Sequence, residues 1–306
     1  PVGDIDSIIP EAVLHSLQQQ QLESVWIDLT DALRGPAHVA KMLVRRCQER
    51  RSTPTRPYKI NQEQLQCIAL FVPRLEQAFL ERPDPSQPWL HAACVLMTMI
   101  MDGGGGCGKT TLSTDILLPL LETFFHPEGV LRRAPSNKPA RLIGGRTMHS
   151  AQGLTPDSSM RTHALALNVQ TRQKLAVTHV DAGALYIDEY SQLQGELNQE
   201  RWGRLPVVVY SGDHLQLPPV PASSSMLAPL ESTTNEHKVG AKIFRDADLV
   251  FEFQQAMRFT DHTLIDILNT MRVPGGKALT EQQWQALKST EVSAEQPDIQ
   301  ASWYHS

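Results

Sequence analysis

The sequence lacks the hallmarks of several protein classes. None of its four cysteines forms a C-x-x-C pair, so the sequence indicates neither a zinc site of the usual spacing nor a disulfide framework. No apolar run reaches the roughly 18 residues needed to cross a membrane, and the N-terminus has no signal peptide. We therefore expect an intracellular protein with no membrane association. The compartment would be the nucleus or a mitochondrion in a eukaryote and the cytoplasm in a bacterium.

Basic charge is not in excess either. The formal net charge is −5 over 306 residues, so any surface that binds nucleic acid must be a local patch. The length fits one large domain or two, with ample core, and the sequence contains no internal repeat. Because the chain begins with Pro1 rather than Met, we expect either a fragment or a chain whose first Met was removed.

What the sequence does contain is a glycine-rich loop. It fits G-x-x-x-x-G-K-[ST], with Gly103, Gly108, Lys109 and Thr110 at the fixed positions. Glycines let backbone N–H groups close around phosphate oxygens, and a helix that starts at the loop points its positive end at the same anion. Lys109 can reach the β- and γ-phosphates, and the Thr110 hydroxyl can ligate Mg²⁺. The other residues expected to contact nucleotide are Gly104, Gly105, Gly106, Cys107 and Thr111.

The context of the loop supports this interpretation. Residues 94–101 form an apolar run of strand length, as expected for a fully buried parallel strand. Residues 111–118 predict a helix, which Pro119 should end or kink early. A strand, a phosphate loop and a helix in this order predict an α/β protein that binds nucleotide.

A second strand ends in two carboxylates. Residues 182–190 form a buried strand that ends at Asp188 and Glu189. In phosphate-loop ATPases an acidic pair at this position serves hydrolysis, because the Asp holds Mg²⁺ and the Glu polarises the attacking water. A third strand, residues 206–213, precedes Gln216, which either senses a γ-phosphate or is an ordinary turn residue. We expect His214 to be structural.

Other segments predict local structure. Asn61 can cap a helix in which Gln64 completes the capping box. Residues 129–135 predict a short strand followed by a helix that Ser136 caps, and residues 142–154 predict a surface loop. The basic cluster at residues 45–51 fits either a nucleic-acid contact or, more simply, cations at a helix C-terminus.

Taken together, these segments resemble superfamily 1 DNA helicases that move 5′ to 3′. The most similar groups are the petite-integration-frequency family, the RecD-like helicases and the helicase domains of Helitron-type transposons. The most specific match is G-D-H-L-Q-L-P-P-V at residues 212–220, because a phosphate-loop kinase or other transferase has no reason to carry it. The resemblance covers roughly residues 58 to 290.

The resemblance implies a RecA-like fold, with ATP and Mg²⁺ as ligands and single-stranded DNA as track. Gln64 would contact adenine, and the acidic pair and Gln216 would serve hydrolysis. Arg258, in a segment similar to the fourth family motif, would reach the γ-phosphate. The implied DNA contacts are Ser136, Asn137, Lys138, Thr147, His149 and Ser150. Roles in DNA repair, recombination and telomere maintenance would follow, whereas no expectation about oligomeric state arises.

The implied domains are a helical N-terminal segment with linker (1–57), a RecA-like ATP-binding domain (58–245) and the start of a second RecA-like domain (246–306). The family motifs expected after Arg258, including a final Arg finger, are not found before Ser306. The segment between Glu189 and Gly212 is also shorter than the family pattern. Two interpretations therefore stay open: the N-terminal half of a motor, or a remnant that binds ATP and DNA but hydrolyses little.

Overall fold

The computed structural model describes residues 29–32, 34–80, 97–152, 181–193, 205–216, 225–227, 235–257, 261–272 and 277–289, with a few single residues between 170 and 179. The chain divides into two compact units, Pro1–Gln255 and Ala256–Ser306. Among the described helices, none combines the length and the apolar character needed to cross a membrane.

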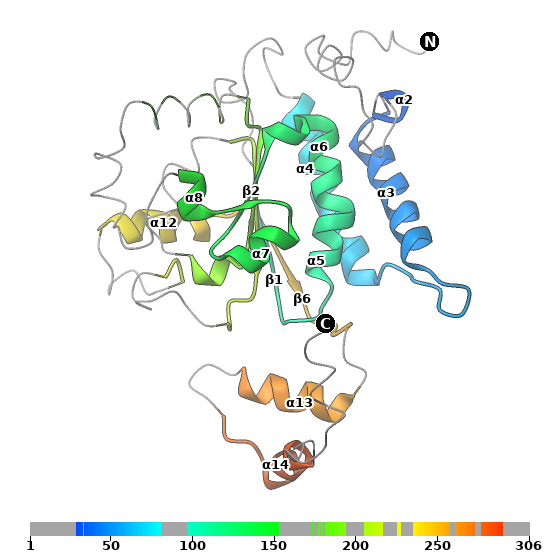
Figure 1. Ribbon diagram of the computed structural model, residues 1–306, viewed down its shortest axis with the longest axis vertical. Helices are drawn as coiled ribbons and strands as arrows, with labels where there is room; N and C mark the ends of the chain where they lie inside the picture. Colours follow the sequence, from blue (N-terminus) through cyan, green and yellow to red (C-terminus); the bar gives the residue numbers. More distant parts are fainter. Residues whose placement is uncertain are drawn as a thin grey trace. The chain divides into compact units, whose positions relative to one another are not determined.

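The first unit is built on a six-stranded parallel sheet (Figure 1). The order across the sheet is β3-β2-β4-β5-β1-β6. The strands are β1 (Met97–Gly103), β2 (Val130–Ala134), β3 (Arg146–Thr147), β4 (Ala184–Asp188), β5 (Val207–Gly212) and β6 (Leu249–Phe253). Every residue of β1, β4 and β5 is buried, as expected for central parallel strands covered on both faces. The predicted α/β fold with a parallel sheet is confirmed.

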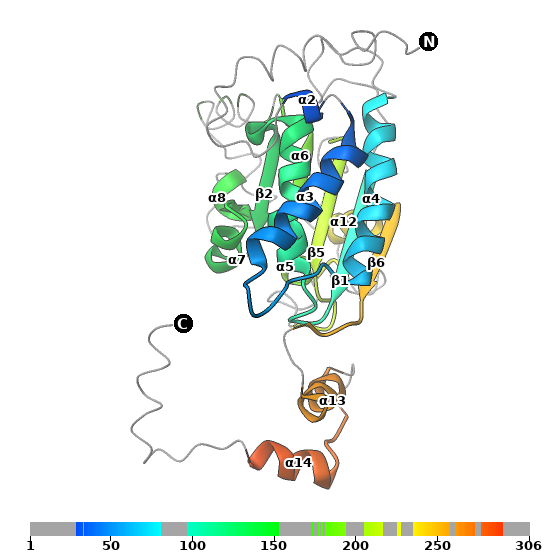
Figure 2. The same ribbon diagram turned by 90° about the vertical axis from the view of Figure 1, so that its right-hand side faces the viewer.

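Successive side chains of the central strands enter two different cores, because side-chain direction alternates along a strand. Met99 and Tyr186 belong to one buried cluster, and Ile100 and Tyr210 belong to the other. The first cluster lies under α3 (Pro36–Arg51), α4 (Gln62–Leu80), α5 (Lys109–Leu112), the π-helical turn η3 (Ser113–Leu117) and α6 (Leu118–Phe125). The second includes residues of α8 (Met148–Gln152) and α12 (Asn235–Arg245). Figure 2 shows α3 and α4 covering the first face.

Helix α3 lies within the predicted helical N-terminal segment (1–57) and packs against the core of the sheet. Val39 is fully buried, and Leu43 and Cys47 are each 3% exposed in the same cluster as the sheet. Gly35 (φ 88°) occupies the N-cap position of this helix and Pro36 its first turn, where proline is well tolerated. The short helix α2 (Leu29–Ala32) precedes it, and the helices predicted nearer the N-terminus lie outside the described residues.

The helix after the phosphate loop does not end at Pro119. The chain continues through η3 and α6 as far as Phe125, with Pro119 in the first turn of α6. In a regular helix the proline ring clashes with the carbonyl four residues earlier. Here the N–H of Leu118 bonds to Ser113 O, five residues back, so the turn is widened just before the proline. The expected break is therefore replaced by a π turn.

The prediction of a surface loop at residues 142–154 is wrong for residues 146–152. After α7 (Asn137–Leu142), the chain forms the two-residue strand β3 and then α8. Both elements are too short to show a period in the sequence. They extend the sheet beyond β2, where β3 pairs with Arg133 and Ala134.

The first unit extends past residue 246, where we predicted the second domain to begin. β6 pairs with β1 along its whole length, and Asp248 ties the two strands by accepting a hydrogen bond from Thr98 N at 2.7 Å. The first unit therefore extends to Gln255. The second unit contains α13 (His262–Met271) and α14 (Glu281–Lys288). Thr280 caps α14 in a capping box.

Candidate nucleotide-binding site

The predicted functional residues of the first unit that the structure describes lie mainly along one edge of the sheet. All strands are parallel, so their C-terminal ends lie on the same edge, which is where open α/β sheets bind ligands. The phosphate loop follows β1, the acidic pair lies at the end of β4, and Gln216 follows β5. Because β1 and β4 flank β5, these three segments are neighbours.

The phosphate loop needs its glycines. Gly103, Gly106 and Gly108 have φ of 152°, 84° and 92°, a region that residues with a Cβ rarely adopt. A Cβ on Gly103 would also lie 2.6 Å from Phe253 O. Gly105 is exposed with open space around it, and Cys107 is buried. Of the remaining loop residues, Gly104 and Thr111 are partly buried and Thr110 is exposed.

Lys109 lies across the loop that precedes it. Its Nζ donates hydrogen bonds to Gly103 O at 2.5 Å and Gly104 O at 3.1 Å. The same charge lowers the pKa of both Asp188 and Glu189, although other effects prevail. Lys109 therefore donates hydrogen bonds to the phosphate loop and also acts electrostatically on the acidic pair.

Gln64 braces the phosphate loop. Its side chain is 1% exposed and donates to Gly108 O at 3.0 Å. The predicted capping box is confirmed, since Asn61 Oδ1 accepts from Gln64 N at 2.7 Å and Gln64 Oε1 accepts from Asn61 N at 3.1 Å. The bond to Gly108 was not evident from the sequence, and contact with adenine stays a prediction.

The acidic pair is held in an unusual backbone conformation. Glu189 has φ 55° and ψ 46°, a left-handed conformation that costs free energy in a non-glycine residue and clusters at functional sites. Asp188 is 8% exposed, and burial raises its pKa despite the Ser211 hydroxyl and Lys109. Burial and the neighbouring Asp188 raise the pKa of Glu189. Two carboxylates at close range favour the protonated forms, unless a cation joins them.

The residues present fit a magnesium nucleotide. Glu189 Oε2 is buried and makes no hydrogen bond to any residue that the structure describes, a costly arrangement that a ligand or water would relieve. Gly105 and Thr110 are exposed in the loop, close in sequence to Lys109, whose charge acts on both carboxylates. Thr110 and Asp188, which offer oxygen ligands of the kind hard cations prefer, stay the predicted metal ligands.

The turn after β5 carries Gln216. Its backbone N–H donates to Asp213 O at 3.0 Å, and the side chain is partly buried. The structure thus places Gln216 in a turn at the nucleotide edge, and its sensing role stays a prediction. Arg258 and residues 217–220 lie outside the described residues.

The predicted DNA contacts lie at the same edge, beyond β4. Ser136, Asn137 and Lys138 are exposed at the start of α7. Ser136 occupies the N-cap position without making the side-chain hydrogen bond that we predicted. Thr147 Oγ1 accepts from Ser150 N at 3.3 Å, and His149 is partly buried between them. These residues surround the ends of β2 and β3.

Two arginines at this edge were missed. Arg133 and Arg146 face each other across β2 and β3, and neither pairs with a carboxylate within the described part of the chain. Burial, together with the charge of Arg146, lowers the pKa of Arg133 to about 10, so Arg133 stays charged at neutral pH. The sequence shows a basic residue in each of the two strands, but only the pairing of β2 with β3 shows that Arg133 and Arg146 are neighbours.

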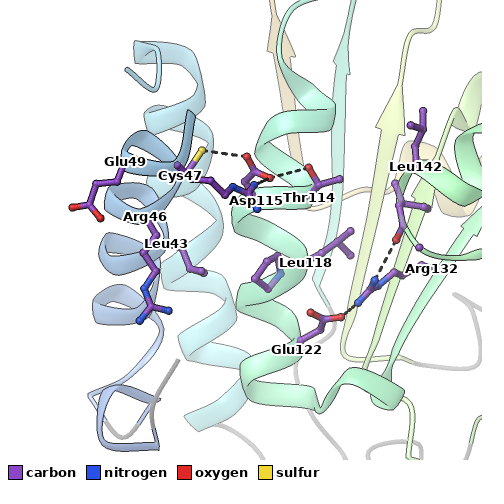
Figure 3. Close-up of a pocket in the computed structure, with 14 residues that line it drawn as sticks. Leu43, Arg46, Cys47, Glu49, Thr114, Asp115, Leu118, Glu122, Arg132 and Leu142 are labelled. Carbon is purple, nitrogen blue, oxygen red and sulfur yellow. Dashed lines mark hydrogen bonds and ion pairs between the residues drawn. The ribbon is translucent and has the colours of Figure 1, made fainter. Parts of the chain in front are cut away.

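A cavity of about 680 Å³ lies elsewhere, between α3, the η3–α6 segment and the β2–α7 segment (Figure 3). Several of its charges are already paired: Asp115 with Arg50 and Arg51, and Glu122 with Arg132. No residue predicted to bind nucleotide or DNA lines it. Arg50 and Arg51 of the basic cluster thus attach the end of α3 to η3, a role that neither interpretation of the sequence included.

Comparison with known families decides between nucleotide-binding classes. Residues 99–295 match the family model of the viral superfamily 1 RNA helicase core domain. The chain belongs to this superfamily 1 helicase family. The match begins in β1 and includes the phosphate loop, the acidic pair and the Gln216 turn.

Individual helicases agree with this assignment. The ATP-dependent DNA helicase PIF1 of Xenopus laevis is 26% identical over 213 residues, which cover 65% of this chain and 31% of that protein. The crystal structure of Pif1 helicase from Candida albicans matches with a TM-score of 0.55 at 20% identity, covering 79% of this chain and 49% of the other. The likeness to the Candida structure supports the fold. This helicase-family chain spans a third to a half of the length of these relatives.

Proposed function

We propose that this chain is the nucleotide-binding core of an ATP-dependent DNA helicase, in which single-stranded DNA stimulates ATP hydrolysis that drives 5′-to-3′ movement. The observation that carries the proposal is the shared sheet edge. It joins a phosphate loop, the acidic pair and the Gln216 turn to the polar and basic groups at the ends of β2 and β3. The name of the Xenopus relative, an ATP-dependent DNA helicase, supports DNA as the track.

Each residue has a defined role. The loop N–H groups and Lys109 bind the phosphates, and Gln64 keeps the loop closed through Gly108. Glu189 accepts a proton from the attacking water, and the buried position of its carboxylate raises its basicity. Bound Mg²⁺ would neutralise phosphate charge, held by Thr110 and Asp188. Gln216 and Arg258 would report the γ-phosphate.

DNA would cross the ends of β2 and β3. Lys138, Arg133 and Arg146 supply positive charge for phosphates, and Thr147, His149 and Ser150 supply polar contacts. Because the net charge of the chain is −5, this local patch must do the binding.

The test is ATPase activity of the chain with and without single-stranded DNA, with single-stranded RNA as a third arm. We expect DNA to raise turnover and Lys109→Ala to abolish it, while Lys41→Ala on the exposed side of α3 leaves it unchanged. Stimulation by RNA alone would replace DNA with RNA as the track. Turnover that no nucleic acid changes would contradict the helicase proposal.

The alternative is a remnant that binds ATP and DNA but hydrolyses little. The raised pKa of Glu189 favours it in part, because a protonated carboxyl cannot act as a base. Tight nucleotide binding without measurable turnover from pH 6 to 9 would support this alternative.

A further inference from the structure

Asp102 is a buried carboxylate that the proposed hydrolysis does not use. It lies in β1 directly before Gly103, the first glycine of the phosphate loop, and is 6% exposed. A carboxylate inside a buried parallel strand is costly unless its oxygens receive hydrogen bonds. This side chain therefore needs a structural or functional explanation.

Two segments supply those hydrogen bonds. Asp102 Oδ1 accepts from the Tyr190 hydroxyl at 2.5 Å and from His214 N at 2.9 Å. Asp102 Oδ2 bonds to His214 Nδ1. Burial alone would raise the pKa of Asp102, but the bonds from Tyr190 and His214 outweigh burial and lower it, so the group is a carboxylate at neutral pH.

Both partners belong to nucleotide segments. Tyr190 follows Glu189 in sequence, and His214 is two residues before Gln216. One carboxylate at the start of the phosphate loop thus touches the residue after the acidic pair and the turn that carries Gln216. The sheet supports this arrangement, because Asp102 pairs with Gly212 across β1 and β5.

The surroundings are shaped for Tyr190. A Cβ on Gly212 would lie 2.7 Å from the Tyr190 ring and 2.9 Å from its backbone N, so only glycine lets the ring pass the end of β5. The ring packs against Phe244 at 5.0 Å and edge-on against Tyr210 at 6.4 Å between centroids. These contacts aim the hydroxyl at Asp102.

We propose that Asp102 is a positioning residue that holds the phosphate loop, the acidic turn at Tyr190 and the His214–Gln216 turn in register, so that nucleotide bound at the loop is sensed at Gln216. This inference rests on the proposed function. Ligand atoms of Asp102, Asp213 and His214 also lie within 4.8 Å of one another. Both Asp102 oxygens already accept from protein donors, so hydrogen bonding rather than metal binding explains the cluster.

The test compares Asp102→Asn and His214→Leu with the matched control Asp248→Asn. Asp248 also accepts a hydrogen bond from β1, at the opposite end of the strand. We expect Asp102→Asn and His214→Leu to lower kcat for DNA-stimulated ATP hydrolysis by about tenfold or more, with KM for ATP within about threefold. His214→Asn keeps a donor near the Nδ1 position and should restore most of kcat.

A second measurement does not require turnover. Amide hydrogen exchange in peptides covering residues 205–216 should slow on binding of a non-hydrolysable ATP analogue in the unaltered chain and in Asp248→Asn, but not in Asp102→Asn. Equal protection in Asp102→Asn and the control would overturn the inference while leaving the ATPase proposal intact. Loss of protection in a chain without turnover would support the inference and contradict the proposed function. A chain that binds no nucleotide would contradict both.

Discussion

Among individual side chains, Glu189 best illustrates the conflict between stability and function. Its backbone is left-handed, one carboxylate oxygen is buried without a hydrogen-bond partner among the described residues, and Asp188 lies beside it. Each of these features destabilises the protein when no ligand is bound, yet each suits a base next to a phosphate loop. Such residues are expected where a site is preorganised for a ligand.

Glu189→Gln should therefore remove hydrolysis and raise stability. Burial and Asp188 raise the pKa of Glu189, so the folded state loses stability as pH rises through that pKa, and a neutral amide avoids this loss at pH 7. We expect turnover to fall by about 10² or more and Tm to rise by about 2–4 °C for each kcal/mol gained. Glu128→Gln, at an exposed position, is the control for calorimetry. A lowered Tm would contradict the proposed electrostatics.

A separate prediction concerns the contribution of Lys138 to DNA binding. It is exposed at the start of α7, beside the ends of β2 and β3. If it contacts one phosphate, Lys138→Ala should weaken single-stranded DNA binding at every sequence and reduce the slope of log K against log salt by about 0.7. Fluorescence anisotropy over a series of salt concentrations measures both. An unchanged slope, equal to that of the exposed control Lys242→Ala, would remove Lys138 from the interface.

For the secondary-structure elements, Asp115 is the main polar link between α3 and η3. Its side chain is 4% exposed and pairs with Arg50 and Arg51, which are 51% and 38% exposed. It also accepts from Cys47 Sγ at 3.4 Å, and the pKa of that thiol is raised to about 11, chiefly by burial. These polar contacts add to the apolar packing of α3 in the buried cluster that also contains Met99 and Tyr186 of the sheet.

Asp115→Asn should destabilise the fold in a pH-dependent way. Burial alone would raise the Asp115 pKa, but the two arginines outweigh it and lower the pKa. The stabilisation is therefore full above the unfolded pKa of about 4 and is lost as pH falls through the lower folded value. We expect a loss of about 1–3 kcal/mol at pH 7, limited by the exposure of the arginines.

Urea unfolding at pH 7 and pH 3 checks this prediction, since the difference from the unaltered chain should shrink at pH 3. Glu49→Gln breaks the exposed pair with Arg45 and should change stability little at either pH. Equal destabilisation by Asp115→Asn at both pH values would contradict the ion-pair explanation.

The elements also indicate what a sequence can predict. β1, the phosphate loop, β4 and α14 were predictable because each has a local signal: an apolar run, spaced glycines, or a capping box. The π turn before Pro119 was not, since it depends on how the helix accommodates the ring. Nor was α8, because five residues are too few to show a helical period. The position of β6 beside β1 depends on a crossover, which no local pattern encodes.

The same limit applies to the site. Lys109, Asp188 and Glu189 were recognisable from residue type and spacing, whereas the contacts that connect them were not. Gln64 was expected to cap a helix, and it does, yet its bond to Gly108 arises only in three dimensions. His214 was expected to be structural. Its contact with Asp102 could not be predicted, because the sequence does not show whether the strand ends before Asp102 or extends to Gly103.

For the whole chain, the first unit should fold alone. All six described strands and both buried clusters belong to residues 1–255. We expect the fragment 1–255 to unfold cooperatively, with Tm within about 4 °C of the main transition of the full chain, a shift of about 1 kcal/mol. Differential scanning calorimetry of both chains measures this. A fragment without a cooperative transition would show that residues after 255 complete the core.

The measurement that tests the central claim most directly is steady-state ATP hydrolysis by the full chain with and without single-stranded DNA, alongside Lys109→Ala and Glu189→Gln. We predict turnover that rises severalfold with DNA, falls again as salt rises, and disappears in both variants, while Glu189→Gln still binds nucleotide. Turnover that DNA does not change, or that survives Lys109→Ala, would contradict a DNA-coupled ATPase at this phosphate loop.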